Sequence, residues 1–310
     1  MEPAAQQQQQ PDILSRLSAA IAARVAAAAP FVAVVDAGRG RRIGGVLWRP
    51  GLVVASRQSL PEADGYAVAA GGGGFRRAAL AGDDAGTNVA VLRLDGEEDA
   101  APPAPLPRAG EQGPGMVVVV LGAGEGGLPT ARLASLLAAG PAWHSMAGGR
   151  IDRLLRLDGR LQAAEEGGPV LDADGALLGM STAGPRGRGL VIPHETVERV
   201  LEPILRDGRV GRAWLGVGLQ PVEVPAALRE AAGRESGLMV VGLAPGGPAE
   251  RAGLLPGDIL LAFDGAAVER ARGLAALLGA EKIGRESELR VMRAGEVRTV
   301  SLVPAARPAA

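Results

Sequence analysis

The sequence contains no cysteine and two histidines, His144 and His194, in separate segments. Disulfides, thiolate nucleophiles and cysteine-ligated metals are therefore excluded, and two distant histidines do not make a metal site. We accordingly expect neither a metal nor a cofactor. Aromatic residues are also scarce, with three Phe, three Trp and one Tyr among 310 residues. The core must therefore consist of aliphatic side chains.

Neither sign of charge is in excess, because 33 Lys and Arg face 34 Asp and Glu, a formal net charge of −1. This balance gives no electrostatic reason to expect nucleic acid or an anionic membrane surface as a partner. Hydrophobic residues make up 47% of the chain. The chain is long enough for two domains of ordinary size.

The N-terminus, MEPAAQQQQQPD, is of low complexity, so we expect residues 1–12 to be a disordered tail. It lacks the positively charged start of a secretory signal. The apolar stretch that follows carries Arg16 and Arg24, and its uncharged run over 25–35 is too short to span a bilayer. These features predict an amphipathic helix, a first strand and a cytoplasmic protein. A periplasmic or membrane-associated protein is the alternative.

From residue 31 to 192, short apolar runs such as LVVAS and MVVVVLGAG alternate with Gly-rich breaks, which predicts a mainly β domain. A helix follows, in which Pro203 should weaken the middle and Gly208 should mark the end. Its apolar face comprises Val197, Val200, Leu201, Ile204 and Leu205. The pattern over residues 214–304 predicts a second unit of strands, with a helix at RGLAALLGA and a hairpin at the C-terminal end of the unit.

Four segments occur in the following order along the chain: GGVLWRPGLVVASRQSL, LAGDDAGTNVAVLRLD, AAEEGGPVLDADGALLGMST and PAERAGLLPGDILLAFDG. Their order and spacing resemble the HtrA/Deg family, in which a chymotrypsin-like double β-barrel serine protease precedes a PDZ domain, a small β-barrel with two helices. The resemblance implies a trypsin-like domain at 13–209, a linker at 210–213, a PDZ domain at 214–304 and a tail at 305–310.

The resemblance places the family's catalytic histidine, aspartate and serine at Gln58, Asn88 and Glu166. An amide cannot act as a general base, and a carboxylate cannot replace a hydroxyl nucleophile. The oxyanion-loop glycine of the family is replaced by Ala164, which disfavours a positive φ there. No catalytic residue is therefore expected, and the sequence predicts a pseudoprotease rather than an enzyme. The alternative is an active serine endopeptidase of protein quality control with a non-standard nucleophile.

Other side chains near these segments offer little replacement chemistry. Ser56, Ser59 and Ser181 have no histidine beside them by motif. Glu165 and Glu166 are adjacent carboxylates, and neighbouring side chains in a loop usually point apart. They therefore form a poor acid/base pair.

The second unit carries the expected binding function. By resemblance, the backbone N–H groups of Leu215, Gly216 and Val217 face a C-terminal carboxylate, and the ligand adds as a strand beside residues 217–221. The side chains expected to line an apolar pocket for the last ligand residue are Leu215, Val217, Leu274 and Leu278.

The expected partners are C-terminal or unfolded peptide segments of other proteins, in a scaffolding, chaperone-like or regulatory role. Assembly with an active relative and a homo-oligomer remain alternatives. Family trimers use N-terminal aromatic contacts, and no aromatic residue precedes Phe31 in this chain.

Overall fold

The computed structural model describes residues 12–96, 110–124 and 128–306. The expected N-terminal tail, apart from Asp12, and most of the expected C-terminal tail lie outside these residues. The chain divides into two compact units. The first comprises Met1–Asp83, Asn88–Pro141 and Asp152–Leu201, and the second comprises Asp84–Thr87, Ala142–Ile151 and Glu202–Ala310.

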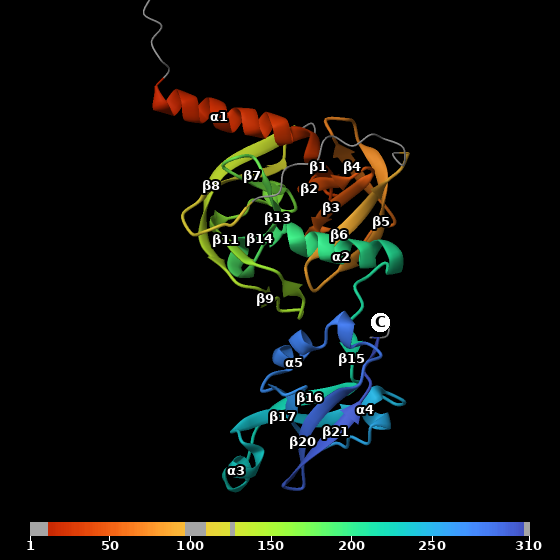
Figure 1. The fold of residues 1–310 in the computed structure, drawn as a ribbon. Coiled ribbons are helices and arrows are strands. Elements are labelled where there is room, and N and C mark those ends of the chain that lie inside the picture. Colours follow the sequence, from red (N-terminus) through yellow and green to blue (C-terminus); the bar gives the residue numbers. More distant parts are fainter. Residues whose placement is uncertain (1–11, 97–109, 125–127, 307–310) are drawn as a thin grey trace, which may run out of the picture. The chain divides into compact units, whose positions relative to one another are not determined.

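The first unit begins with a closed barrel of six strands in the order β1-β2-β3-β6-β5-β4 (Figure 1). Its strands are β1 (Val32–Asp36), β2 (Arg42–Arg49), β3 (Leu52–Ser56), β4 (Tyr66–Ala70), β5 (Arg76–Asp84) and β6 (Val89–Leu94). Every residue of β3 is buried, which explains why its sequence, LVVAS, is an unbroken run without polar alternation. The barrel interior is filled by aliphatic side chains such as Val35, Ile43, Val53 and Leu92.

A second closed barrel of six strands follows, in the order β11-β14-β13-β12-β7-β8. Its strands are β7 (Val117–Ala123), β8 (Pro129–Gly140), β11 (Leu154–Arg160), β12 (Pro169–Asp172), β13 (Leu177–Ala183) and β14 (Arg188–Pro193). A small ribbon, β9 (Trp143–His144) with β10 (Arg150–Ile151), separates β8 from β11. Val118, Val120, Leu136 and Leu155 lie in the interior. The mainly β, double-barrel prediction is confirmed.

Two helices accompany the barrels. Helix α1 (Ile13–Ala28) begins at Asp12, whose side chain accepts a hydrogen bond from the Leu14 amide. Helix α2 (His194–Asp207) continues through Pro203, and the Gly208 amide closes it by donating to the Ile204 carbonyl at 2.8 Å. On the predicted apolar face of α2, Val197, Val200, Leu201 and Ile204 are all at most 1% exposed.

The second unit contains an antiparallel sheet in the order β16-β17-β18-β20-β21, to which the short β19 (Ala266–Ala267) is added. Its long strands are β16 (Val217–Glu223), β17 (Ser236–Leu243), β18 (Ile259–Phe263), β20 (Ser287–Arg293) and β21 (Glu296–Leu302). The helices are α3 (Arg229–Ala232), α4 (Pro248–Arg251) and α5 (Ala271–Leu277). Strand β15 (Ala213–Trp214) pairs with β22 (Ala305–Ala306), so strands lie at both predicted boundaries of this domain.

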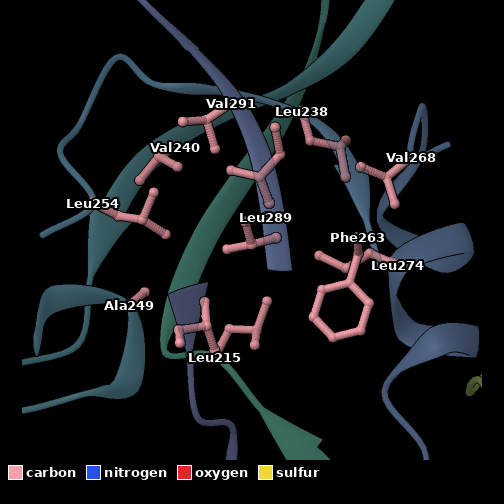
Figure 2. Packing of buried hydrophobic residues seen from close by; sticks show 12 residues of the cluster. Leu215, Leu238, Val240, Ala249, Leu254, Phe263, Val268, Leu274, Leu289 and Val291 are labelled. Atoms are coloured by element: carbon pink, nitrogen blue, oxygen red, sulfur yellow. The ribbon is translucent and has the colours of Figure 1, made fainter. Parts of the chain in front are cut away.

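Aliphatic side chains and one phenylalanine fill the core of this sheet (Figure 2). Phe263 at the end of β18 is fully buried and lies close to Leu274 of α5 in Figure 2. The close-up also shows Leu215, from the segment before β16, directed into the same core. This packing fixes both the segment before β16 and helix α5 to the sheet.

Candidate functional sites

The structure brings the three predicted triad positions together within the first unit. Gln58 lies on the 3-10 turn that follows β3, Asn88 directly precedes β6, and Glu166 directly precedes the Gly-Gly-Pro that leads into β12. Gln58 Nε2 donates to Glu166 Oε1 at 2.5 Å. The backbone amide of Gln58 donates to Asn88 Oδ1 at 2.8 Å. The three side chains therefore belong to one site, although they come from distant segments.

Two buried hydroxyls complete the hydrogen-bond network. Ser56 Oγ donates to Glu166 Oε1 at 2.9 Å and accepts from Asn88 Nδ2 at 2.9 Å. Asn88 Nδ2 also donates to Thr182 Oγ1 at 2.7 Å. Thr182, on β13, is a member of the site that sequence reasoning missed, because nothing in the run GMST indicates which strand faces Gln58. Gln58 Nε2 and Ser56 Oγ, from segments of the first barrel, both donate to the carboxylate of Glu166, which directly precedes a strand of the second barrel.

Glu165 points away from Glu166 and has other partners. Its carboxylate accepts from Arg132 Nε on β8 at 2.6 Å and from the Gln162 amide at 2.9 Å. The hydrogen bond to the Glu165 carboxylate raises the pKa of Arg132 above its ordinary value, against the opposing effect of burial. Ser181 Oγ donates to the Glu165 carbonyl at 2.5 Å. Glu165 and Ser181 therefore hold the loop in place, and the two glutamates do not form an acid/base pair.

The turn after Glu166 requires glycine. Gly167 has a φ of +89°, and a Cβ atom at this position would lie 2.2 Å from the Gly44 carbonyl oxygen. Ala164 lies in a 3-10 turn over Ala163–Glu165 and does not have a positive φ. The alanine at this position is thus compatible with the backbone that the loop adopts.

The chemistry available here is that of amides, a carboxylate and hydroxyls. The imidazole of His194 packs against Trp48, with ring centroids 5.0 Å apart and ring planes tilted by 33°. In the part of the chain that the structure describes, no group of three or more His, Cys, Asp or Glu side chains could hold a metal ion. The hydroxyl that contacts Glu166 belongs to Ser56, whose exposed fraction is 0%.

A second candidate site lies at the start of β16 in the other unit. The Leu215 carbonyl accepts from the Ala249 amide at 2.8 Å, and the Gly216 carbonyl accepts from the Ala244 amide at 2.9 Å. The N–H groups of Leu215 and Gly216 have no hydrogen-bond acceptor among the described residues, although both residues are buried. Buried amides without a partner are rare in folded proteins and indicate a place for a ligand.

The strand after these amides has an open edge. Among the strands that the structure describes, β16 pairs with β17 on one side and ends the sheet on the other, and α5 contacts it (Figure 1). Leu215 and Leu274 are buried in the core, whereas Val217 and Leu278 are partly buried against it. The four side chains predicted to line a pocket thus lie around one end of β16.

Two barrels of this topology followed by such a sheet define a trypsin-like domain with a PDZ domain. The profile of the trypsin-like peptidase domain matches residues 44–180, and that of the PDZ domain matches residues 213–303. The chain belongs to the HtrA/Deg family of serine proteases.

Curated relatives and solved structures agree with this assignment. The "Probable periplasmic serine endoprotease DegP-like" of Brucella suis biovar 1 (strain 1330) is 29% identical over 273 residues, which cover 86% of this chain and 52% of the relative. The protein of the same name from Halomonas elongata is 29% identical over 277 residues, with 84% and 55% covered. The chain therefore spans about half the length of the curated relatives it matches.

Among solved structures, "HtrA-type protease AlgW with decapeptide" has a TM-score of 0.72 and 25% identity, covering 93% of this chain and 99% of that one. "Crystal structure of the serine endoprotease from Yersinia pestis" has a TM-score of 0.71 and 23% identity, with 97% and 100% covered, and shares the fold.

These relatives contradict two predictions. The chain was expected not to be an enzyme, but the relatives are named serine endoproteases, so this prediction is wrong. It rested on the substitutions at Gln58, Asn88 and Glu166 and on the absence of a histidine beside the neighbouring serines. A cytoplasmic location is also wrong, since the relatives are named periplasmic. The cytoplasmic prediction considered only the uncharged run 25–35. The longer helical stretch Ile13–Phe31 is long and apolar enough to cross a membrane by length and composition. A signal sequence has the same properties.

Proposed function

We propose that this HtrA-family chain binds the C-terminal segments of other polypeptides through its PDZ domain. The observation that carries the proposal is the pair of N–H groups on the buried residues Leu215 and Gly216, which have no acceptor among the described residues and lie at the start of an open sheet edge. A terminal carboxylate supplies the two acceptors that these amides lack, and a charge-assisted hydrogen bond is stronger than a neutral one. The preceding ligand residues then pair with β16 as an added strand.

The side chains around this edge favour an apolar last residue in the ligand. Val217 and Leu278 retain partial exposure beside the buried Leu215 and Leu274, so an aliphatic side chain between β16 and α5 would remove more apolar surface from water. The AlgW structures are titled as complexes with a decapeptide and with a tripeptide, which supports peptide binding by relatives of this fold.

The test is a binding titration of the full chain with a pair of peptides that differ only at the C-terminus. One peptide ends in a free carboxylate after an apolar residue, and the other carries a terminal amide. We expect the carboxylate form to bind at least about tenfold more tightly, because the amide loses the charge and adds a donor opposite two donors. Equal affinity for the two forms would exclude the proposed mode.

A second candidate function is endopeptidase activity in the trypsin-like domain at a non-standard nucleophile. The names of the relatives favour it, and so does the 2.9 Å hydrogen bond from Ser56 Oγ to Glu166 Oε1. In this arrangement Glu166 would accept the proton of Ser56 as the hydroxyl oxygen attacks a substrate carbonyl. Because Ser56 is fully buried, the reaction requires the network of Gln58 and Asn88 to open around it.

Casein cleavage and labelling by a fluorophosphonate probe test this candidate. Activity that is lost in both Ser56→Ala and Glu166→Gln supports it. Ser135→Ala is the matched control, because Ser135 Oγ also donates to a carboxylate, that of Asp158, at 2.8 Å outside the site. Labelling that persists in Ser56→Ala would exclude Ser56 as the nucleophile.

We also propose that the chain works in the periplasm. The relatives' names and the apolar stretch Ile13–Phe31 support this location. Fractionation of cells that express the full chain tests it, with recovery in the periplasmic or membrane fraction as the expected result.

A further inference from the structure

The proposed binding mode fixes which ligand residue faces which residue of β16, and the following inference rests on that mode. A carboxylate at the Leu215 and Gly216 amides puts the last ligand residue beside Val217. The penultimate residue then lies opposite Gly218. Because successive side chains in a strand point to opposite faces, and Val217 and Leu219 pack on the core side, the penultimate side chain points to the other face of the sheet.

On that face, the sheet leaves an apolar side chain uncovered. Gly218 is exposed and has no side chain of its own. On the neighbouring strand β17, Val241 has an exposed fraction of 52%. A Cβ atom built at Gly218 would lie 3.5 Å from Val241 Cγ2, at ordinary van der Waals distance. Gly218 therefore opens a gap through which a side chain on an added strand reaches Val241.

A β-bulge causes this exposure. Gly218 is opposite Gly242 and Leu219 is opposite Val240, so that Val241 is the extra residue of β17 at a register shift. Bulges change the direction of a side chain and occur often next to functional sites. Here the bulge lies at the position where the proposed ligand strand would begin.

We propose that Gly218 and Val241 form a subsite for the penultimate side chain of the ligand, which selects large apolar residues, aromatic ones above all. An aromatic side chain opposite a glycine covers the exposed backbone of the neighbouring strand, and aromatic contacts with β-branched residues stabilise strand pairs. An alanine at this ligand position is too short to reach Val241, and an aspartate would place a charge against an apolar surface.

The test uses the full chain and fluorescence polarisation with peptides that share an apolar last residue and carry Tyr, Ala or Asp at the penultimate position. We expect the Tyr peptide to bind about threefold to fivefold more tightly than the Ala peptide, the range given by one favourable cross-strand pair. The Asp peptide should bind no better than the Ala peptide. In Val241→Thr, which keeps shape and β-branching, the ratio of Tyr to Ala affinities should fall below about twofold.

Val303→Thr is the matched control, because Val303 is similarly exposed at 48%. This variant should leave the ratio of Tyr to Ala affinities unchanged. Gly218→Val provides a second variant, in which a side chain fills the gap. It should weaken binding of the Tyr peptide and have little effect on the Ala peptide. Gly218 does not have a positive φ, so the backbone tolerates this change.

The outcomes separate the two proposals. If binding requires the free carboxylate but the penultimate residue has no effect, the subsite is wrong and the binding mode stands. If the preference for Tyr is unchanged in both Val241→Thr and Gly218→Val, the subsite lies elsewhere. If the amidated peptide binds as well as the acid, the binding mode fails and the subsite fails with it.

Discussion

Gln58 and Glu166, 108 residues apart in the sequence, are joined by a hydrogen bond of 2.5 Å between Gln58 Nε2 and Glu166 Oε1. The amide follows a strand of the first barrel and the carboxylate precedes a strand of the second. Ser56 and Asn88 extend the same network, which therefore connects the barrels at the site. Glu166 is half-buried, and a carboxylate that accepts several hydrogen bonds there contributes to stability as well as to the chemistry of the site.

Glu166→Ala should therefore destabilise the trypsin-like domain. It removes the acceptor at 2.9 Å from Ser56 Oγ, which keeps only Thr182 Oγ1 at 3.5 Å, and it deprives Gln58 Nε2 of its shortest hydrogen bond, at an expected cost of about 1–3 kcal/mol. Urea unfolding at pH 7 measures the change. Glu62→Ala, at an exposed loop position, should change the midpoint little, and equal midpoints for the two variants would show that the network contributes nothing to stability.

A second carboxylate of structural importance lies in the PDZ domain. Asp258 is 1% exposed and forms a two-pronged ion pair with Arg293, with N–O distances of 2.8 and 2.7 Å. Burial raises the pKa of Asp258, but the hydrogen bonds from Arg293 and from the Leu255 amide, with the charge of Arg293, lower it further, and the net pKa is below its ordinary value.

Because its pKa is lowered in the folded state, Asp258 contributes stability at pH values above its unfolded pKa of about 3.9. This contribution is lost as the pH falls through the pKa of Asp258 in the folded state. Asp258→Asn should cost about 2–3 kcal/mol at pH 7, less than a fully buried pair because Arg293 is partly exposed, and should flatten the acid limb of the stability curve below about pH 4. Unfolding of the PDZ domain measured between pH 7 and pH 3 checks both effects. The exposed Glu286→Gln is the control, and an unaltered acid limb in Asp258→Asn would contradict the assignment.

The links between β2 and α2 allow a third prediction. Trp48 Nε1 donates to Glu198 Oε1 at 2.6 Å, and Arg49 donates to Glu198 Oε2 at 3.0 Å. Burial raises the pKa of Glu198, whereas these two hydrogen bonds and the charges of Arg49 and His194 lower it, and the net pKa is below its ordinary value. Trp48→Phe removes a donor to an ionised acceptor and should cost about 1–2 kcal/mol at pH 7. The pKa of Glu198, followed by NMR, should rise in the variant, and an unchanged pKa would show that the hydrogen bond from Trp48 does not lower it.

The sequence allowed the arrangement of domains to be predicted because the relevant signals are local. Buried strands such as LVVAS, the apolar face of α2 and the Gly-Gly-Pro turn depend on residues near one another in the chain. The same patterns located Gln58, Asn88 and Glu166 by resemblance, and the structure shows them in contact. The hydrogen-bonding role of Thr182 could not be predicted. It depends on how strand β13 of the second barrel lies against the first barrel, which the residues near Thr182 in the sequence do not specify.

The exposure of Val241 and the unpartnered amides were also out of reach of the sequence. Each depends on a register shift or a turn that no residue pattern specifies. The predictions of location and of activity failed for another reason, because each relied on a feature that this sequence lacks. For location this was a basic N-terminus, and for activity it was the three usual catalytic side chains. Neither absence outweighs the names of the relatives, which are periplasmic serine endoproteases.

The turn that carries Glu166 gives the last prediction. At Gly167 the φ is +89°, and a Cβ atom added there would lie 2.2 Å from the Gly44 carbonyl oxygen, so any side chain is both strained and sterically blocked. Gly167→Ala should therefore destabilise the trypsin-like domain by more than about 3 kcal/mol, since the colliding atom is backbone in β2 and cannot rotate away. Gly74→Ala is the matched control, because Gly74 has open space around its Cβ position and no positive φ, and it should leave stability unchanged or slightly raised. Urea unfolding of both variants decides the matter, and a Gly167→Ala protein as stable as Gly74→Ala would show that the loop bearing Glu166 adopts a different backbone from the one described.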